Sequence, residues 1–450
     1  MSRERSLTGS RIGRLAMMGR LAGGMVGGML GEGARQLARG QRASLADLVL
    51  TPANMDRLAE RLSEMRGAAM KVGQLLSMDS GDMLPPALGE LLARLREDAH
   101  TMPLGEVADV LRNAWGEGWQ SRFHQFSFTP IAAASIGQVH SAHLDDGRRV
   151  AVKVQYPGVR ASIDSDVDNV SALLRIARVL PERFDIGPLL DEAKRQLHLE
   201  ADYQYEADSL TRFAALLDDD PRFLLPNPVP ELCTGEVLCM QFLSGDPIES
   251  LRQAAAGRRD AAAGALTGLA LREVFEWGLV QTDPNFANYL YDVDTGQIQL
   301  LDFGATRVYP EHRRNALLAL LMAAVDGDDS DLLDAATAVG YLTENDSGRY
   351  RQVVIQLLRM AAEPARQDNY SFGTTDLAQR MRNVVIDMRL REPMGQLPPV
   401  DVLYLHRKLG GLYLLLARLR ARVPVKQLVR ELPFLPDRPR SGQSATLAAV

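Results

Sequence analysis

The part of the chain that most constrains its fold lies between residues 281 and 304. Asp283 precedes Asn288 with four residues between them, and Asp302 begins an Asp-Phe-Gly tripeptide. Two short apolar runs lie between Asn288 and Asp302, and the Asp-Thr-Gly that separates them favours a tight turn. A lone Asp-Phe-Gly is weak evidence, because any strand can end in an acid and a glycine. The whole ordered set is much more specific.

This spacing is typical of the phosphoryl-transfer half of a protein-kinase-like site. In that chemistry an acidic group lies near the nucleophile, and an Asn and a second Asp hold magnesium on the triphosphate. By spacing, Asp283 is the catalytic residue, and Asn288 and Asp302 are the metal ligands. The alternative interpretation is two loop carboxylates beside an ordinary β-hairpin turn.

The nucleotide-binding half is expected upstream, where strands are predicted at 137–144 and 148–155. Lys153 stands in the place of the lysine that reaches the α and β phosphates. Alanines occupy the first two glycine positions of the pattern Gly-x-Gly-x-x-Gly-x-Val, so the predicted phosphate-covering loop is alanine-rich. Its predicted nucleotide-binding residues are Ala132, Ala133, Ala134, Ser135, Gly137 and Val139.

A third predicted strand, at 236–242, ends in a turn-rich break at 243–247. We interpret this break as the hinge between two lobes. The residues expected to face adenine are Met240, Gln241, Phe242 and Leu243.

Lysine is scarce in this chain. Only five of the 51 basic residues are lysine, namely Lys71, Lys153, Lys194, Lys408 and Lys426. A lysine kept where arginine is the rule indicates a need for a compact charge on a flexible stem. The alternative is a lysine that extends from a strand edge into water.

Together these motifs resemble the UbiB/AarF family of atypical kinases, most closely its mitochondrial coenzyme Q branch and related proteobacterial proteins. The resemblance covers about residues 45 to 430. It implies an α+β, bilobal, protein-kinase-like fold with a small β-rich N-lobe, a helical C-lobe and a helical N-terminal extension. It rests on the segments 65–77, 132–140, 150–153, 200–207, 281–288 and 301–307.

The resemblance also implies regulatory residues. Lys71 and Gln74 belong to a Lys-x-Gly-Gln element that lies over the nucleotide site in this family and occludes a protein substrate. Glu200 and Asp202 are expected to support that element from a helix, predicted at 189–216, that is equivalent to helix αC.

Lys153 needs a carboxylate from the same helix. Asp202 and Glu206 are four residues apart and share a helix face, whereas Glu200 is rotated away from Glu206. We therefore assign Glu206 to Lys153, and Glu200 with Asp202 to Lys71. The predicted catalytic residues are then Asp283, Lys153 and Glu206. The reverse assignment is an open alternative.

A chain of 450 residues is long enough for two lobes and an extension. The predicted organisation is a basic, glycine-rich membrane-surface or targeting segment at 1–44 and a helical Lys-x-Gly-Gln extension at 45–115. An N-lobe with a helical insert follows at 116–243, then a C-lobe at 244–432 and a disordered tail at 433–450.

The N-terminal segment has a charge of its own. Residues 1–44 hold eight arginines and two glutamates, so they carry +6 and the remainder carries −12. The apolar run between Arg20 and Glu32 would extend about 17 Å as a helix, about half of a bilayer core. An anionic membrane surface is the expected partner. A disordered Arg- and Gly-rich tail and a mitochondrial presequence are the alternatives.

No long activation segment and no Ala-Pro-Glu follow Asp302, so phosphorylation of proteins in trans is disfavoured. We predict an enzyme, a Mg-dependent ATPase with ATP and Mg²⁺ as cofactors. Its support of isoprenoid-quinone (ubiquinone) biosynthesis at a membrane surface is implied by the resemblance. A small-molecule or lipid kinase and a catalytically silent, nucleotide-binding lipid chaperone are the alternatives.

The expected partners are quinone precursors and other quinone-biosynthesis proteins. Nucleic acid is not expected, and a homodimer is possible. The two cysteines, Cys233 and Cys239, lack metal-ligand spacing and suit a reducing compartment. The predicted location is cytoplasmic, peripheral on the inner membrane, with the matrix face of the mitochondrial inner membrane as the alternative.

Overall fold

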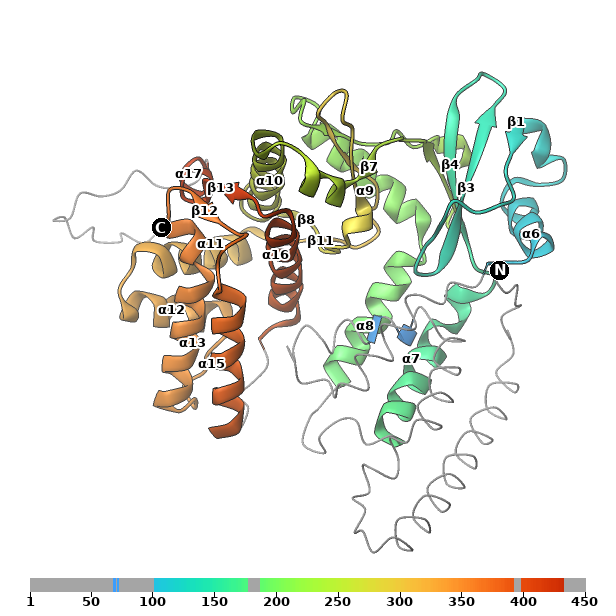
Figure 1. The fold of residues 1–450 in the computed structure, drawn as a ribbon. Helices are drawn as coiled ribbons and strands as arrows, with labels where there is room; N and C mark the ends of the chain where they lie inside the picture. Colours follow the sequence, from blue (N-terminus) through green and yellow to red (C-terminus); the bar gives the residue numbers. More distant parts are fainter. Residues whose placement is uncertain (1–67, 70, 73–100, 177–186, 392–397, 433–450) are drawn as a thin grey trace, which may run out of the picture. The chain divides into compact units, whose positions relative to one another are not determined.

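The computed structural model describes residues 68–69, 71–72, 101–176, 187–391 and 398–432. The chain divides into two compact units (Figure 1). Unit 1 takes the residues up to Asp246 together with Asn288–Ala305, and unit 2 takes Pro247–Ala287 and the residues from Thr306 onward. The predicted segments 1–44 and 433–450, most of 45–115, and Gln74 lie outside the described residues.

Unit 1 combines a β-sheet with helices. Its elements are α6 (Leu104–Trp115), η2 (Trp119–Arg122), β1 (Phe123–Phe126), β2 (Ala132–Ala133), β3 (Gly137–Leu144), β4 (Arg149–Gln155), α7 (Val159–Ile176), α8 (Gly187–Glu200), α9 (Tyr203–Leu216), β5 (Phe223–Leu224), η3 (Pro230–Leu232), β6 (Val237–Gln241), β9 (Tyr289–Tyr291) and β10 (Ile298–Leu300). Two short elements, β7 (Asp246–Pro247) and η6 (Phe286–Asn288), cross the borders between the units.

The main sheet of unit 1 is antiparallel, in the order β1, β3, β4, β6, and β2 pairs with the start of β3. Strand β4 is buried along nearly its whole length because it lies between β3 and β6. An apolar cluster that includes Val107 and Leu111 of α6 and the rings of Trp115, Trp119 and Phe123 packs with the sheet. The strands predicted at 137–144, 148–155 and 236–242 are therefore confirmed to within one residue at each end.

The single helix predicted at 189–216 was wrong, because the chain forms α8 and α9 with a break at Ala201 and Asp202. Asp202 caps α9 by accepting a hydrogen bond from the Gln204 N–H at 3.2 Å. The break also frees backbone groups for the sheet region, since the Ala201 carbonyl accepts from the Gln155 side chain at 3.1 Å.

Unit 2 is mainly helical. Its elements are η4 (Ile248–Gln253), α10 (Ala256–Leu271), η5 (Arg272–Trp277), β8 (Leu279–Gln281), β11 (Thr306–Val308), α11 (Glu311–Asp326), α12 (Asp329–Val339), α13 (Gly348–Ala361), α14 (Glu363–Arg366), β12 (Tyr370–Ser371), α15 (Leu377–Arg391), α16 (Val400–Leu419), β13 (Arg422–Val423) and α17 (Val425–Arg430).

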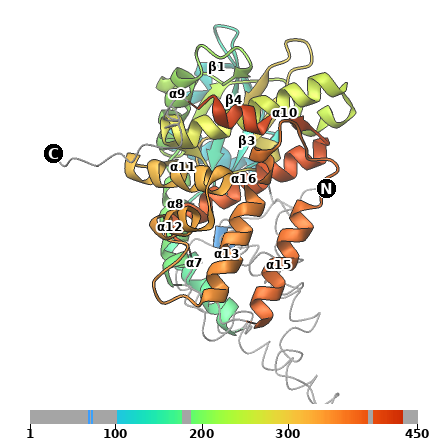
Figure 2. The ribbon, with the colours of Figure 1, turned by 90° about the vertical axis from the view of Figure 1, so that its left-hand side faces the viewer.

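In unit 2, α11, α12 and α13 contact one another, and α15 contacts α13 (Figure 2). Leu317, Leu332 and Val402 belong to the apolar core of this unit. The two-stranded pairs of β8 with β11 and of β12 with β13 were missed from the sequence, because strands of two or three residues are too short to show a period of two. No helix among the described residues combines the length and the apolar content that crossing a membrane requires.

Candidate functional site

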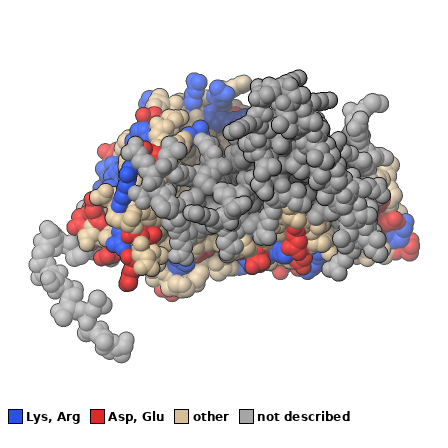
Figure 3. Space-filling model, turned by 90° about the horizontal axis from the view of Figure 1, so that it is seen from below, with Lys and Arg blue, Asp and Glu red and all other residues tan. Residues whose placement is uncertain are grey.

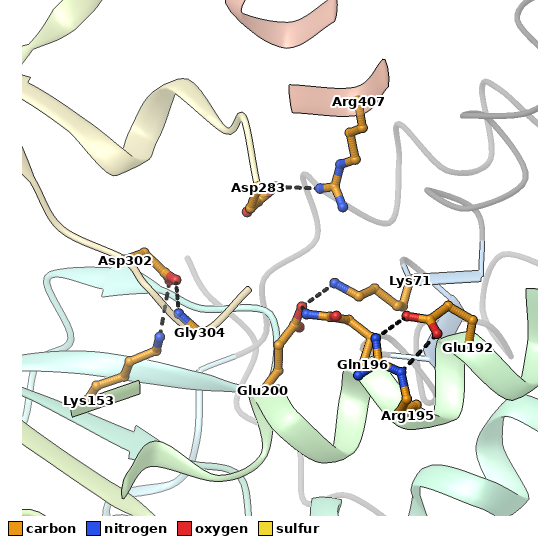
Figure 4. A network of polar contacts seen from close by, with 10 residues as sticks. All are labelled: Lys71, Lys153, Glu192, Arg195, Gln196, Glu200, Asp283, Asp302, Gly304 and Arg407. Carbon is orange, nitrogen blue, oxygen red and sulfur yellow. Dashed lines mark hydrogen bonds and ion pairs between the residues drawn. The ribbon is translucent and has the colours of Figure 1, made fainter. Parts of the chain in front are cut away.

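Lys153 connects strand and helix in unit 1. It lies on β4, and its Nζ donates to both carboxylate oxygens of Glu206 on α9, at 2.9 and 2.8 Å. The same Nζ donates to Asp302 Oδ2 at 3.2 Å (Figure 4). Glu206 is therefore the carboxylate that meets Lys153, in agreement with our first assignment. This is the ion pair that a kinase-like site requires.

The three charges of this cluster influence one another. Burial, with Asp302 nearby, raises the pKa of Glu206 to about 7 in spite of Lys153. Burial alone would lower the pKa of Lys153, but Asp302 and Glu206 hold it well above its usual value. Burial alone would raise the pKa of Asp302, but Lys153 and the Gly304 N–H keep that pKa low. Lys153 and Asp302 are thus charged at neutral pH, whereas Glu206 gains or loses its proton near pH 7.

Replacing Glu206 by Gln should flatten the pH dependence of stability. Between pH 4.5 and about 7 the folded protein keeps a proton on Glu206 that the unfolded chain has released. Wild-type stability is therefore lost as pH rises through this window, by an amount on the order of 3 kcal/mol. Urea unfolding of both proteins at pH 5, 6 and 7 would measure this. If the free energies of unfolding of the two proteins differed by the same amount at every pH in this window, the raised pKa of Glu206 would be contradicted.

The two predicted metal ligands, Asn288 and Asp302, are brought to one end of a hairpin. Asn288 immediately precedes β9, Asp302 follows β10, and Leu300 of β10 lies opposite Tyr289 of β9. The Leu301 N–H donates to the Asn288 carbonyl at 3.0 Å. At the other end, the hairpin turns at Gly296, which has a φ of 78°.

Asp302 is oriented by its neighbours. The Gly304 N–H donates to its Oδ1 at 3.0 Å (Figure 4), and the ring of Phe303 packs against Phe213 of α9 at 4.7 Å. An amide oxygen and a carboxylate suit Mg²⁺, which commonly takes one or two protein oxygens together with phosphates. Within the described ranges no group of three or more His, Cys, Asp or Glu side chains is arranged to hold a metal ion.

The alanine-rich loop forms a tight hairpin between β2 and β3. Ala132 and Ala133 are exposed, Ala134 and Ser135 are half-buried, and the Ala134 N–H donates to the Gly137 carbonyl at 2.9 Å. Gly137 is required by packing, since a Cβ there would lie 2.3 Å from the Val154 carbonyl oxygen.

The half-buried Val139 pairs with Lys153 across β3 and β4. Contact of this loop with phosphates stays a prediction.

The predicted adenine-facing residues lie at the end of β6. Met240 is buried, Gln241 is exposed, and Phe242 and Leu243 are half-buried. The guanidinium of Arg149 lies 3.7 Å from the ring centroid of Phe242, and the Phe242 N–H donates to the Arg149 carbonyl at 3.0 Å. Their contact with adenine also stays a prediction.

The predicted regulatory residues are only partly brought together. Lys71 is buried and pairs with Glu200 at the end of α8 (Figure 4). The pairing of Asp202 with Lys71 was wrong: Asp202 caps α9 and lies 3.6 Å from Arg160. The physical reason is the helix break, which places Asp202 at a helix start and not on a shared helix face.

Asp283, in unit 2, pairs with Arg407 of α16 (Figure 4). Next to Arg407 on the same helix, Lys408 forms a buried ion pair with Glu273 of η5 at 2.7 Å. Sequence reasoning missed Arg407 and Glu273. The scarcity of lysine was the one available signal, because it set Lys408 apart.

Residues 94–336 match the family described as the ABC1 atypical kinase-like domain. The chain is 37% identical to the mitochondrial atypical kinase COQ8B of Rattus norvegicus, over 96% of this chain and 82% of that protein. It is 36% identical to the mitochondrial atypical kinase COQ8 of Saccharomyces cerevisiae, over 95% of this chain and 85% of that protein.

A solved structure, that of Rv3197 with erythromycin from Mycobacterium tuberculosis, is also similar. It superposes with a TM-score of 0.58 and 28% identity, over 84% of this chain and 95% of that one. Together with the sheet of unit 1 and the helices of unit 2, these likenesses confirm the predicted α+β, kinase-like fold.

Proposed function

Because the chain belongs to the ABC1 (UbiB/AarF) family of atypical kinases, we propose that it is a Mg²⁺-dependent ATPase that supports ubiquinone biosynthesis at a membrane surface. The observation that carries the enzymatic part is the bond of Lys153 to both Glu206 and Asp302 in one buried cluster. Buried charges are costly, and clusters of them are common at functional sites, so this cluster supports a site that uses a nucleotide.

Each residue has a distinct role in this proposal. Lys153 would bind the α and β phosphates, and Glu206 would hold the lysine in place. Asn288 and Asp302 would hold Mg²⁺, which, when bound, compensates the charge of the triphosphate. Asp283 would be the acidic group near the attacking nucleophile.

The short connection after Asp302 favours water or a small acceptor over a protein substrate. Strand β11 begins two residues after Gly304 and pairs with β8, and α11 begins at Glu311. The described chain therefore has no long activation segment here to hold a peptide.

The two alternatives remain distinguishable. A small-molecule or lipid kinase would place the phosphate on an organic acceptor, whereas an ATPase releases it into solution. A silent lipid chaperone would tolerate loss of the metal ligands. The pairs of Lys153 with Glu206 and Asp302 favour an enzyme, and the measurement of where the phosphate goes separates the ATPase from the kinase.

Complementation tests the biological role. Wild type should restore ubiquinone in a quinone-deficient strain, whereas Asp302→Asn should not and should leave precursor lipids accumulated. Full rescue by Asp302→Asn would favour the chaperone. Failure of the wild type would count against a role in this pathway.

The basic N-terminal segment is the proposed membrane contact. Residues 1–44 carry +6, so attraction to anionic lipid is assigned to them. On the face seen in Figure 3, the described basic and acidic side chains are interspersed. We propose that the protein is peripheral on the inner membrane, with the matrix face of the mitochondrial inner membrane as the alternative. The proposed partners are quinone precursors, other biosynthetic proteins and a second copy of this chain.

Deleting residues 1–40 should release the protein from anionic liposomes, and raised salt should partly mimic the deletion. Changing Arg11, Arg14 and Arg20 to Gln in the full-length chain is the matched control, since it removes charge and keeps the apolar run. Liposome flotation measures the membrane-bound fraction of the truncated protein and of the Arg-to-Gln variant. Equal recovery of truncated and full-length protein would assign binding to the folded body.

A further inference from the structure

Helix α16 contacts the segment around Asp283 in unit 2 at successive points. Arg407 pairs with Asp283 itself. Gly411, one turn further along, lies against Pro284 so closely that a Cβ at position 411 would be 2.2 Å from the Pro284 Cβ. Because both residues belong to one helix, they hold neighbouring residues of the segment relative to a single rigid element.

A second connection runs through the buried pair of Lys408 and Glu273. Both side chains are almost fully inaccessible, at 5% and 2% exposure. The Gln281 backbone N–H donates to the Glu273 carboxylate, so the pair also reaches the residue two positions before Asp283. Glu273 projects from η5, a π-helical turn, and such turns recur at functional sites.

The charges in this pair are costly to bury. Burial raises the pKa of Glu273, although Lys408 and the Gln281 N–H oppose the effect. Apolar residues of similar volume often replace a buried pair without loss of stability. Stability alone therefore does not explain why an ionic pair occupies this place.

Resting on the proposed function, we infer that Lys408, Glu273 and Gly411 are positioning residues that hold the backbone on either side of Asp283 for phosphoryl transfer. Glu273 fixes the Gln281 N–H, Lys408 fixes Glu273, and the bare Cα of Gly411 lets α16 lie against Pro284. A small misplacement of a catalytic group can cost about 100-fold in rate. These residues should affect kcat much more than KM for ATP.

The role of residue 273 as the acceptor for the Gln281 N–H can be tested in variants that contain no buried charge at positions 273 and 408. The double variants Glu273→Gln/Lys408→Met and Glu273→Leu/Lys408→Met both remove the ion pair at similar volume, but only Gln keeps an oxygen that can accept from Gln281. The Gln variant should keep kcat within about fivefold of wild type, and the Leu variant should lose about 100-fold. Equal kcat values in the two variants would overturn the inference.

Gly411→Ala and Gly410→Ala form the second matched pair. Both put alanine into α16, but a Cβ at position 410 has nothing within 4 Å, whereas one at 411 meets Pro284. Gly411→Ala should lower kcat by about tenfold or more, and Gly410→Ala should change it by less than about twofold. Indistinguishable kcat values would count against contact of α16 with this segment as a determinant of rate.

Leu332→Ala serves as the stability control. Leu332 is fully buried in α12 and belongs to the core of unit 2, so its truncation lowers the Tm without removing a contact to Asp283. Measured well below every Tm, Leu332→Ala should keep its kcat. If Leu332→Ala loses as much kcat as Glu273→Leu/Lys408→Met, the pair acts through stability and not through position.

The full-length protein is used throughout, with Mg-ATP as the substrate. Wild-type protein that hydrolyses no ATP would overturn the proposed function and this inference with it. Active wild type with no difference within the two matched pairs would overturn the inference alone.

Discussion

Asp302→Asn should lower the Mg²⁺-dependent ATPase rate by about 100-fold or more. Asp302 accepts from the Gly304 N–H through one oxygen and from Lys153 through the other. An asparagine keeps one acceptor but loses the charge, and its NH₂ group must face either Lys153 or the Gly304 N–H. The triphosphate and its metal then lose a compensating carboxylate when the transition state forms.

The measurement is phosphate release by purified protein, with nucleotide binding titrated in parallel with and without Mg²⁺. Asp294→Asn is the matched control, because it makes the same chemical change at the exposed turn of the same hairpin. An unchanged rate in Asp302→Asn would refute the role of Asp302, and an equal loss in Asp294→Asn would assign the effect to the hairpin.

Lys153→Met should lower the free energy of unfolding by about 3–5 kcal/mol at pH 8, because it leaves the buried Glu206 carboxylate without its counter-ion. The loss should be smaller at pH 5. The pKa of Glu206 is already raised to about 7 beside Lys153, and without the lysine it rises further. At pH 5 Glu206 carries a proton in both proteins, so only the lost contact of Lys153 with Asp302 still lowers the stability of the variant.

Urea unfolding at pH 5 and pH 8 would measure this difference. Lys194→Met is the control, since Lys194 pairs with Asp168 where the aspartate is 64% exposed, and such pairs contribute about 1 kcal/mol or less. If Lys153→Met lost the same free energy at both pH values, Glu206 would not be the group that titrates.

The alanine-rich loop shows what a local sequence pattern can predict and what the structure adds. Its glycine at position 137 was expected from the kinase pattern, and the structure adds the reason: the Val154 carbonyl leaves no room for a Cβ. The second position, Ala134, has no positive φ, so alanine is compatible with the hairpin as it stands. That the loop binds nucleotide stays a prediction.

Helix boundaries were harder to predict than strand boundaries. The apolar run of β4 and the turns on either side of it are local, so the strand was predicted to within one residue. The break between α8 and α9 depends on what surrounds it, because Gln155 of β4 binds the Ala201 carbonyl. A sequence window around Asp202 contains a good capping residue but no sign that the sheet competes for the backbone there.

The sequence by itself determined the fold class and the order of the motifs that carry Lys153, Asn288 and Asp302, because each motif depends on short-range spacing and on turn residues. Only the tertiary structure decided which side chains meet. Asp283 and Arg407 are 124 residues apart in sequence, and Glu273 and Lys408 are similarly distant. Such pairs form because helix packing brings distant segments together, and no periodicity within either segment encodes the identity of its partner.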